Sequence, residues 1–219
     1  MDINIIYQDK NIIVCLKPVG VDSEGEGMPA LLRETTGAGE IFCVHRLDRT
    51  VGGVMVYAKT KTAAGRLSAA IASGEMRKEY LAVISGTPQE PQGTLRDLLF
   101  HDKSRNKTYV VNRERRGVKQ AVLDYTLLAS AEGMSLVRVL LHTGRSHQIR
   151  VQFASRGMPL AGDGKYGSTV KLPSPALFSC RLAFPHPVSG KELCFSALPG
   201  EGSPWDMFSA ELTDEGASG

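Results

Sequence analysis

The chain has 219 residues, of which 42% are hydrophobic and 22% are charged, a balance typical of a folded globular protein. This length allows one sizeable core or two small lobes, and the apolar runs of only a few residues exclude a membrane-spanning helix. The N-terminus lacks a basic segment followed by a long apolar one, so no secretory signal is expected. The four cysteines form no Cys-x-x-Cys pair, and Cys15 and Cys194 lie in strand-like runs, which favours buried free thiols in a reducing cytoplasm over a disulfide or a zinc site.

The formal net charge is only +3, but basic residues are concentrated in the middle of the chain. Residues 59–119 hold 13 lysines and arginines against 6 aspartates and glutamates. A basic middle in a nearly neutral protein indicates either a surface that faces a polyanion or a solvated face without a partner.

Hydrophobic periodicity and turn signals predict the order of the elements. The expected strands span residues 3–7, 12–17, 54–59, 80–84, 121–128, 135–142, 177–184 and 192–198. The expected helices span residues 61–73 and 145–156, and a short helical segment is expected near residues 29–34. Because strands outnumber helices and the connections are short, we expect an α+β fold with a mostly antiparallel sheet.

Three details complete this pattern. The helix at 61–73 has Thr60 or Thr62 as its N-cap and Gly74 after its last turn. Residues 87–119 contain the densest basic run and are punctuated by prolines and glycines, which predicts a basic hairpin or a long loop. The tail at 200–219 is polar and acidic, and we expect it to be frayed, with Trp205 as its one anchor.

Asp48 follows His45-Arg46-Leu47 and precedes the glycine pair Gly52-Gly53, which leads into an apolar strand. Paired glycines let a loop adopt backbone angles closed to other residues and let another molecule approach the main chain. An acid beside a basic residue on such a loop is either a catalytic carboxylate or a turn-capping Asp next to a surface arginine.

The stretch from His45 to Lys59 resembles the signature of the RluA-type family of RNA pseudouridine synthases. Arg77 to Val83 is similar to the Lys-x-Tyr-x-Ala segment of that family, and Thr143 to Val151 to its Gly-Arg-x-His-Gln-Ile-Arg segment. The opening with Lys17-Pro18-Val19-Gly20 and the later Phe184-Pro185-His186-Pro187 also fit. The resemblance runs from about Ile5 to Leu198 with the motifs in family order, which makes it far more specific than any one motif.

The resemblance implies a pseudouridine synthase-like mixed, mostly antiparallel sheet in two lobes with a central active-site cleft. The catalytic domain would span residues 1–199, followed by the tail. Because only about ten residues precede the first motif, the small N-terminal S4 domain of many relatives is expected to be absent. The implied activity is the isomerisation of specific uridines in structured RNA, ribosomal or transfer, by a cytoplasmic monomer with no membrane association. The reaction has no redox step, so no cofactor and no metal are expected.

The resemblance also implies site residues: Asp48 as the catalytic carboxylate, Arg150 as its cation and Tyr80 as the ring that stacks on the target base. Burial alone would oppose ionisation of Asp48, and a cation at hydrogen-bond distance would favour it. Without the motifs, a strand tyrosine such as Tyr80 is far more often a core residue, and the alternative for Arg150 is a solvated helix charge.

Helical geometry bears on the choice between two arginines. On a regular helix over 145–156, Arg150 lies roughly 140° from Arg145, so only one of them can face Asp48. We assign Arg150 to the carboxylate, and Arg145 and Gln148 to the helix start or to contacts with the RNA backbone.

Further residues are expected to contact RNA. Arg46 resembles the family arginine that fills the space left when the target uridine flips out of a stem. Arg113, Arg115 and Arg116 are expected to contact phosphates; the alternative is a solvated hairpin tip.

Two departures from the family pattern stand out. Val51-Gly52 replaces a usual Thr-Ser, so the loop loses two hydroxyls, and Gln152 stands where relatives often have His. A non-catalytic RNA-binding protein or RNA chaperone is the main alternative function, but such a protein needs no set of Asp48, Tyr80 and Arg150. An Asp-dependent hydrolase is disfavoured because no second carboxylate lies near Asp48 in sequence.

Overall fold

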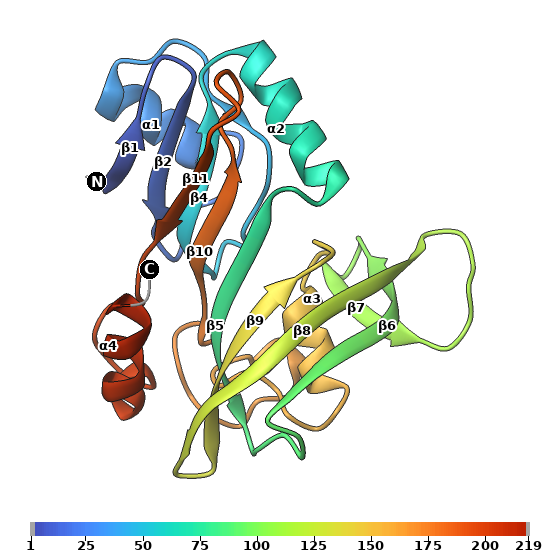
Figure 1. Cartoon of the computed structure of the whole chain (residues 1–219). Helices are drawn as coiled ribbons and strands as arrows, with labels where there is room; N and C mark the ends of the chain where they lie inside the picture. Colours follow the sequence, from blue (N-terminus) through green and yellow to red (C-terminus); the bar gives the residue numbers. More distant parts are fainter. Residues whose placement is uncertain (1–2, 218–219) are drawn as a thin grey trace. The chain divides into compact units, whose positions relative to one another are not determined.

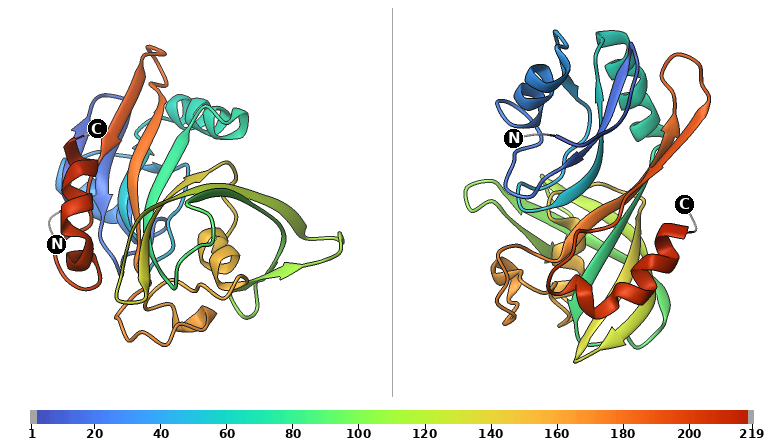
Figure 2. Two further views of the ribbon diagram at one scale, coloured as in Figure 1. Left: turned by 60° about the horizontal axis from the view of Figure 1, so that its bottom comes forward. Right: turned by 90° about the vertical axis from the view of Figure 1, so that its left-hand side faces the viewer.

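The protein is described by a computed structural model that covers residues 3–217. The chain divides into two compact units (Figures 1 and 2). Unit 1 contains the chain up to Lys78 together with Phe178–Pro199. Unit 2 contains Glu79–Leu177 together with the C-terminal residues from Gly200.

Unit 1 is built on a mixed sheet in the order β1-β2-β4-β10, with β3 added to β4 and β11 added to β10. Its strands are β1 (Ile5–Gln8), β2 (Ile12–Lys17), β3 (Phe42–Cys43), β4 (Gly52–Ala58), β10 (Leu177–Pro185) and β11 (Glu192–Ser196). All pairs are antiparallel except β4 with β10, which is parallel. Its helices are α1 (Met28–Thr36) and α2 (Lys61–Ser73).

Helix α2 shows why the predicted boundaries hold. The hydroxyl of Thr60 accepts a hydrogen bond from the N–H of Ala63 at 3.1 Å, and Gly74 ends the helix in the left-handed conformation at φ 80°. The helix buries Ala63 and Leu67 against the strand core of unit 1. The capping residues and the apolar face therefore specify the same helix.

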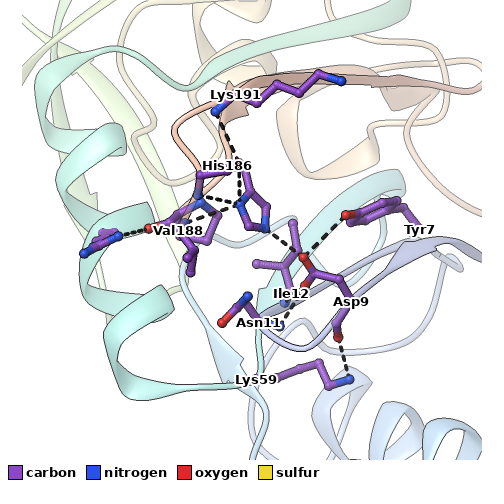
Figure 3. Close-up of polar contacts among 11 residues, drawn as sticks. Tyr7, Asp9, Asn11, Ile12, Lys59, His186, Val188 and Lys191 are labelled. Carbon is purple, nitrogen blue, oxygen red and sulfur yellow. Dashed lines mark hydrogen bonds and ion pairs between the residues drawn. The ribbon is translucent and has the colours of Figure 1, made fainter.

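A polar cluster joins two distant turns of unit 1 (Figure 3). Asp9 accepts hydrogen bonds from the N–H groups of Asn11 and Ile12 at 2.7 and 2.8 Å. His186 Nδ1 accepts from the N–H of Ser189 at 3.0 Å, so its proton is on Nε2, which donates to Asp9 at 2.8 Å. Burial acts to raise the pKa of Asp9, but these hydrogen bonds outweigh it and hold that pKa below its ordinary value.

Unit 2 is built on a sheet in the order β5-β9-β8-β6-β7. Its strands are β5 (Arg77–Ser85), β6 (Gln92–Asp102), β7 (Lys107–Val111), β8 (Val118–Ala131) and β9 (Met134–Leu141). The β6–β7, β6–β8 and β8–β9 pairs are antiparallel, and β6 and β7 form the expected basic hairpin. Helix α3 (Gln148–Ala154) lies on the concave side of this curved sheet (Figure 2) and packs Val151 against Leu99 and Ala121.

The expected fold class is confirmed, since both units combine helices with mostly antiparallel strand pairs. Within the described residues none of the four cysteines forms a disulfide; Cys15 and Cys180 are buried as expected, whereas Cys43 is half-buried and Cys194 is exposed. No helix among residues 3–217 is both long and apolar enough to cross a membrane.

Two expectations are wrong. The helix expected over 145–156 covers only Gln148–Ala154, because His147 takes the left-handed conformation at φ 54° and starts the helix late. The tail is not frayed over the described residues: it forms a 3-10 turn, η2 (Trp205–Phe208), and helix α4 (Ser209–Ala217). Phe208 and Leu212, four residues apart, are the buried anchors, whereas Trp205 is partly exposed.

Candidate active site

The loop that carries Asp48 is braced from both sides in unit 1. The N–H of Val51 donates to the carbonyl of Asp48 at 2.9 Å and closes a tight turn. The N–H of Gly20 donates to the carbonyl of Arg49 at 2.8 Å, and Arg49 Nε donates back to the carbonyl of Gly20 at 2.8 Å. The Lys17–Gly20 motif therefore serves as a fixed support for the loop.

The glycine pair after the loop is required by close backbone packing. Gly53 has φ 126°, and a Cβ there would lie 2.3 Å from the carbonyl oxygen of Ser179. A Cβ on Gly52 would lie 3.2 Å from the carbonyl oxygen of Lys17. Both glycines let β4 approach its neighbouring strands and so hold the end of the Asp48 loop in place.

Lys17 is a functional candidate that the sequence interpretation missed. Its side chain is 1% exposed, and its ammonium donates to the carbonyls of Pro18 at 2.9 Å, Val21 at 2.6 Å and Arg49 at 3.4 Å. Burial lowers the pKa of Lys17 to about 8, although the carboxylates of Asp22 and Asp48 act to raise it. The signal was the Lys-Pro-Val-Gly motif, which fitted the family but had been given no role.

The residues just before Asp48 are fixed as well. Ser23 Oγ donates to the carbonyl of Leu47 at 2.8 Å and accepts from its N–H at 3.0 Å. His45 Nε2 accepts from the N–H of Val56 at 3.2 Å, and burial together with the nearby charge of Lys78 lowers the pKa of His45 to about 3. His45 is therefore a neutral structural residue at physiological pH.

Arg46, by contrast, lies on the surface. Its side chain is 60% exposed and forms an ion pair with Glu24 at 2.9 Å. An exposed pair of this kind contributes little to stability.

Arg150 is buried in unit 2, so its alternative interpretation as a solvated helix charge is wrong. Its guanidinium forms a two-pronged ion pair with Asp163, with Nε to Oδ2 at 2.6 Å and Nη2 to Oδ1 at 2.8 Å. The same guanidinium lies 5.2 Å from the centre of the Tyr166 ring. Tyr80, on β5 of the same unit, is 5% exposed.

The geometric argument that separated Arg145 from Arg150 is wrong in its premise, because Arg145 precedes the helix. Arg145 Nε donates to the carbonyl of Gln120 at 3.0 Å. Gln148 is buried; its Oε1 accepts from the N–H of Arg145 at 3.0 Å and its Nε2 donates to the carbonyl of Val122 at 3.1 Å. Gln148 thus anchors the start of α3 on the sheet.

Gln152, the second departure from the family pattern, also has a structural partner. It is fully buried, and its Nε2 donates to Asp97 Oδ2 at 2.7 Å. The same carboxylate pairs with Arg156 at 2.9 Å. Asp97 therefore holds the C-terminal end of α3 on β6.

The three arginines Arg113, Arg115 and Arg116 are exposed on the connection between β7 and β8. The Arg115 guanidinium lies 4.6 Å from the centre of the Phe100 ring, which orients it without removing it from solvent. They follow Val111 at the end of β7, away from the β6–β7 turn at residues 103–106.

Unit 1 thus holds Lys17 close enough to Asp48 for their charges to interact, with Arg46 on the surface nearby in the chain, and unit 2 brings together Arg150, Asp163 and Tyr166 and also contains Tyr80. Residues 11–155 match the family of RNA pseudouridylate synthases, and the chain belongs to this family.

Curated relatives agree with this assignment. The chain is 36% identical over 86% of its length to an uncharacterized RNA pseudouridine synthase of Synechocystis and covers 63% of that protein. It is 34% identical over 90% of its length to the ribosomal large subunit pseudouridine synthase D of Vibrio cholerae and covers 67% of it. The chain therefore spans about two thirds of the length of these relatives. The fold is similar to that of human RNA pseudouridylate synthase domain containing 4, with a TM-score of 0.76 and 24% identity over 96% of this chain and 93% of that one.

Proposed function

We propose that this protein is an RNA pseudouridine synthase in which Asp48 is the catalytic carboxylate. The observation that carries the proposal is the family match over residues 11–155, which contains Asp48, Tyr80 and Arg150 within the family's motifs. The bracing of the Asp48 loop supports it, because a catalytic group must be held in a productive geometry.

The reaction breaks the bond from N1 of uracil to C1′ of the ribose and forms a bond from C5 to C1′. The proton on C5 is lost and N1 gains one, so atoms and electrons balance without an oxidant or a reductant. Asp48 serves as nucleophile or base at the displaced uridine. Arg150 provides the positive charge that orients the reacting carboxylate, and Tyr80 stacks on the base that has been flipped out of its stem.

The proposed substrate is structured ribosomal RNA rather than transfer RNA, because relatives at 31% to 34% identity carry the name ribosomal large subunit pseudouridine synthase D. Arg46 would contact the nucleotides around the vacated position. Arg113, Arg115 and Arg116 would contact phosphates, which position an RNA without reading its sequence.

The test is a map of pseudouridines across total RNA from cells with and without this protein. The proposal predicts that one or a few positions in large-subunit ribosomal RNA lose the modification and regain it when the wild-type chain is restored. An unchanged map together with specific RNA binding would instead favour a non-catalytic RNA-binding protein on the same fold.

A further inference from the structure

One loop of unit 2 holds the Arg150 guanidinium on two sides. Asp163 forms the two-pronged ion pair at 2.6 and 2.8 Å, and the ring of Tyr166 lies under the guanidinium at 5.2 Å. The 3-10 turn η1 (Gly164–Tyr166) places these two side chains three residues apart on the same loop. We propose that Asp163 and Tyr166 are positioning residues that fix the plane and temper the charge of Arg150; this inference rests on the function proposed above.

The loop is built to hold its shape. The carbonyl of Asp163 accepts from the N–H groups of Tyr166 at 3.0 Å and Ser168 at 3.1 Å, and the N–H of Asp163 donates to the carbonyl of Leu160 at 3.0 Å. Gly162 has φ 79°, and a Cβ there would lie 2.4 Å from the carbonyl oxygen of Ser174. The Gly162-Asp163-Gly164 sequence is thus a close-packed turn whose buried carboxylate has little freedom to move.

The loop is also pinned to the strand that carries Tyr80. The N–H of Ala161 donates to the carbonyl of Val83 at 2.8 Å, and the N–H of Val83 donates to the carbonyl of Ala176 at 3.0 Å. Val83 lies three residues after Tyr80 on β5. The frame that orients Arg150 is therefore continuous with the frame that orients Tyr80.

Tyr166 is itself fixed by two further elements. Its hydroxyl accepts a hydrogen bond from the N–H of Thr108 on β7 at 2.8 Å and lies 2.8 Å from Nδ1 of His147, the residue before α3. Burial raises the pKa of Tyr166, so its hydroxyl stays protonated at neutral pH. The ring under Arg150 cannot turn without breaking contacts to both β7 and the helix start.

This arrangement has two consequences for a reacting carboxylate. A guanidinium held by a two-pronged pair through Nε and Nη2 has a fixed plane, so the direction of its remaining N–H groups is fixed too. The Asp163 carboxylate also offsets most of the charge of Arg150. Loss of the Asp163 charge would leave Arg150 a stronger but poorly aimed cation, which should lower the rate.

The test compares Asp163→Asn with Asp97→Asn, a matched control that changes the half-buried carboxylate paired with Gln152 and Arg156 at the C-terminal end of α3. Both variants should lose thermal stability, because each removes an ion-pair partner of an arginine on or next to α3. Only Asp163→Asn should lower kcat, by about 100-fold, the effect expected when a catalytic group is misaimed by about 1 Å. Its RNA dissociation constant should stay within about twofold of wild type.

A second pair of variants keeps the inference testable if Asp163→Asn does not fold. Tyr166→Leu removes the ring under the guanidinium and should lower kcat, whereas Tyr166→Phe keeps the ring and should retain most of it. Normal kcat for folded Asp163→Asn or for Tyr166→Leu would overturn the inference, as would equal losses in Asp163→Asn and Asp97→Asn. In both cases wild-type turnover in the same assay would leave the proposed function intact. No turnover by the wild-type enzyme on ribosomal RNA would overturn both.

Discussion

The two units bury one cation each in very different surroundings. Among the described residues, Lys17 of unit 1 and Arg150 of unit 2 are the buried side chains of lysine or arginine. Lys17 is held by three neutral backbone carbonyls, whereas Arg150 is held by the carboxylate of Asp163. Carbonyl dipoles compensate lost hydration only in part, so the pKa of Lys17 falls to about 8. A paired guanidinium stays charged at any pH the fold survives.

The two cations therefore have different roles in the proposed site. Lys17 ties the backbone around Asp48 together, and it titrates in the alkaline range. Arg150 supplies a permanent charge with a fixed direction. If this account is correct, changes at Arg150 should affect the chemical step most, and changes at Lys17 should affect the stability of the loop more than the chemistry.

The largest effect is expected from Arg150→Met. The change leaves the Asp163 carboxylate buried without its partner, which should lower the free energy of unfolding by about 3–5 kcal/mol. Turnover in the folded fraction should fall by at least about 100-fold, because the reacting carboxylate loses its cation. Arg145→Met is the control, since the Nε of that guanidinium donates to the backbone carbonyl of Gln120 in an exposed position, and it should retain most activity. Greater damage from Arg145→Met would contradict the assignment of Arg150.

Lys17→Met should have a smaller effect, and mainly on stability. The variant leaves the carbonyls of Pro18 and Val21 without the ammonium, at a cost of about 1–3 kcal/mol for each group that finds no water. Chemical denaturation measures the loss, and hydrogen exchange at Gly20 and Val51 should show a loosened loop. Unchanged protection of those two amides would show that Lys17 does not stabilise the Asp48 loop.

The pH dependence of stability should differ between wild-type protein and Lys17→Met. Below pH 8 wild-type protein bears the full cost of burying a charged ammonium. Between about pH 8 and 10.5 the native Lys17 has lost its proton while the unfolded chain keeps it, so wild-type stability rises with pH relative to Lys17→Met. Denaturation curves at pH 7.5 and 9.5 should show this gain. A difference that stays constant with pH would show that Lys17 keeps an ordinary pKa.

The smallest effect on the chemistry is expected from the exposed arginines of unit 2. Replacing Arg113, Arg115 and Arg116 by Ser should make the salt dependence of RNA binding shallower by roughly 2–3 units in log K against log salt. It should leave the modified position unchanged, because phosphate contacts carry no sequence information. The matched control replaces the exposed lysines Lys10, Lys61 and Lys191 of unit 1 by Ser. Equal changes in slope for both triple variants would show that the three arginines are not a preferred site of phosphate contact.

The sequence predicted what local signals determine. Thr60 and Gly74 marked the ends of α2 because capping is a property of neighbouring residues. The prolines and glycines of residues 87–119 indicated a hairpin or a long loop without defining its strands, and β6 and β7 form the hairpin. The late start of α3 was missed, because the left-handed backbone of His147 depends on the sheet beneath it. The tail was misjudged because Phe208 and Leu212 find buried positions that composition alone does not reveal.

Only the site residues that lie within the family motifs could be predicted from the sequence. Asp48, Tyr80 and Arg150 came from resemblance, and their chemical roles remain proposals. The pairing of Arg150 with Asp163 joins residues 13 apart through tertiary geometry that no periodicity encodes. Lys17 appeared as one letter of a motif at the end of a strand, and only the three converging carbonyls show why a lysine is buried there.

The most direct test of the central claim is the turnover of Asp48→Asn on ribosomal RNA from cells that lack the protein. The substitution keeps the shape of the side chain and removes its charge and nucleophilicity. The account predicts that the variant binds this RNA as tightly as wild type, melts at nearly the same temperature and forms no pseudouridine, whereas wild type modifies its site fully. Measurable pseudouridine formation by purified Asp48→Asn would contradict the assignment of Asp48 as the catalytic carboxylate.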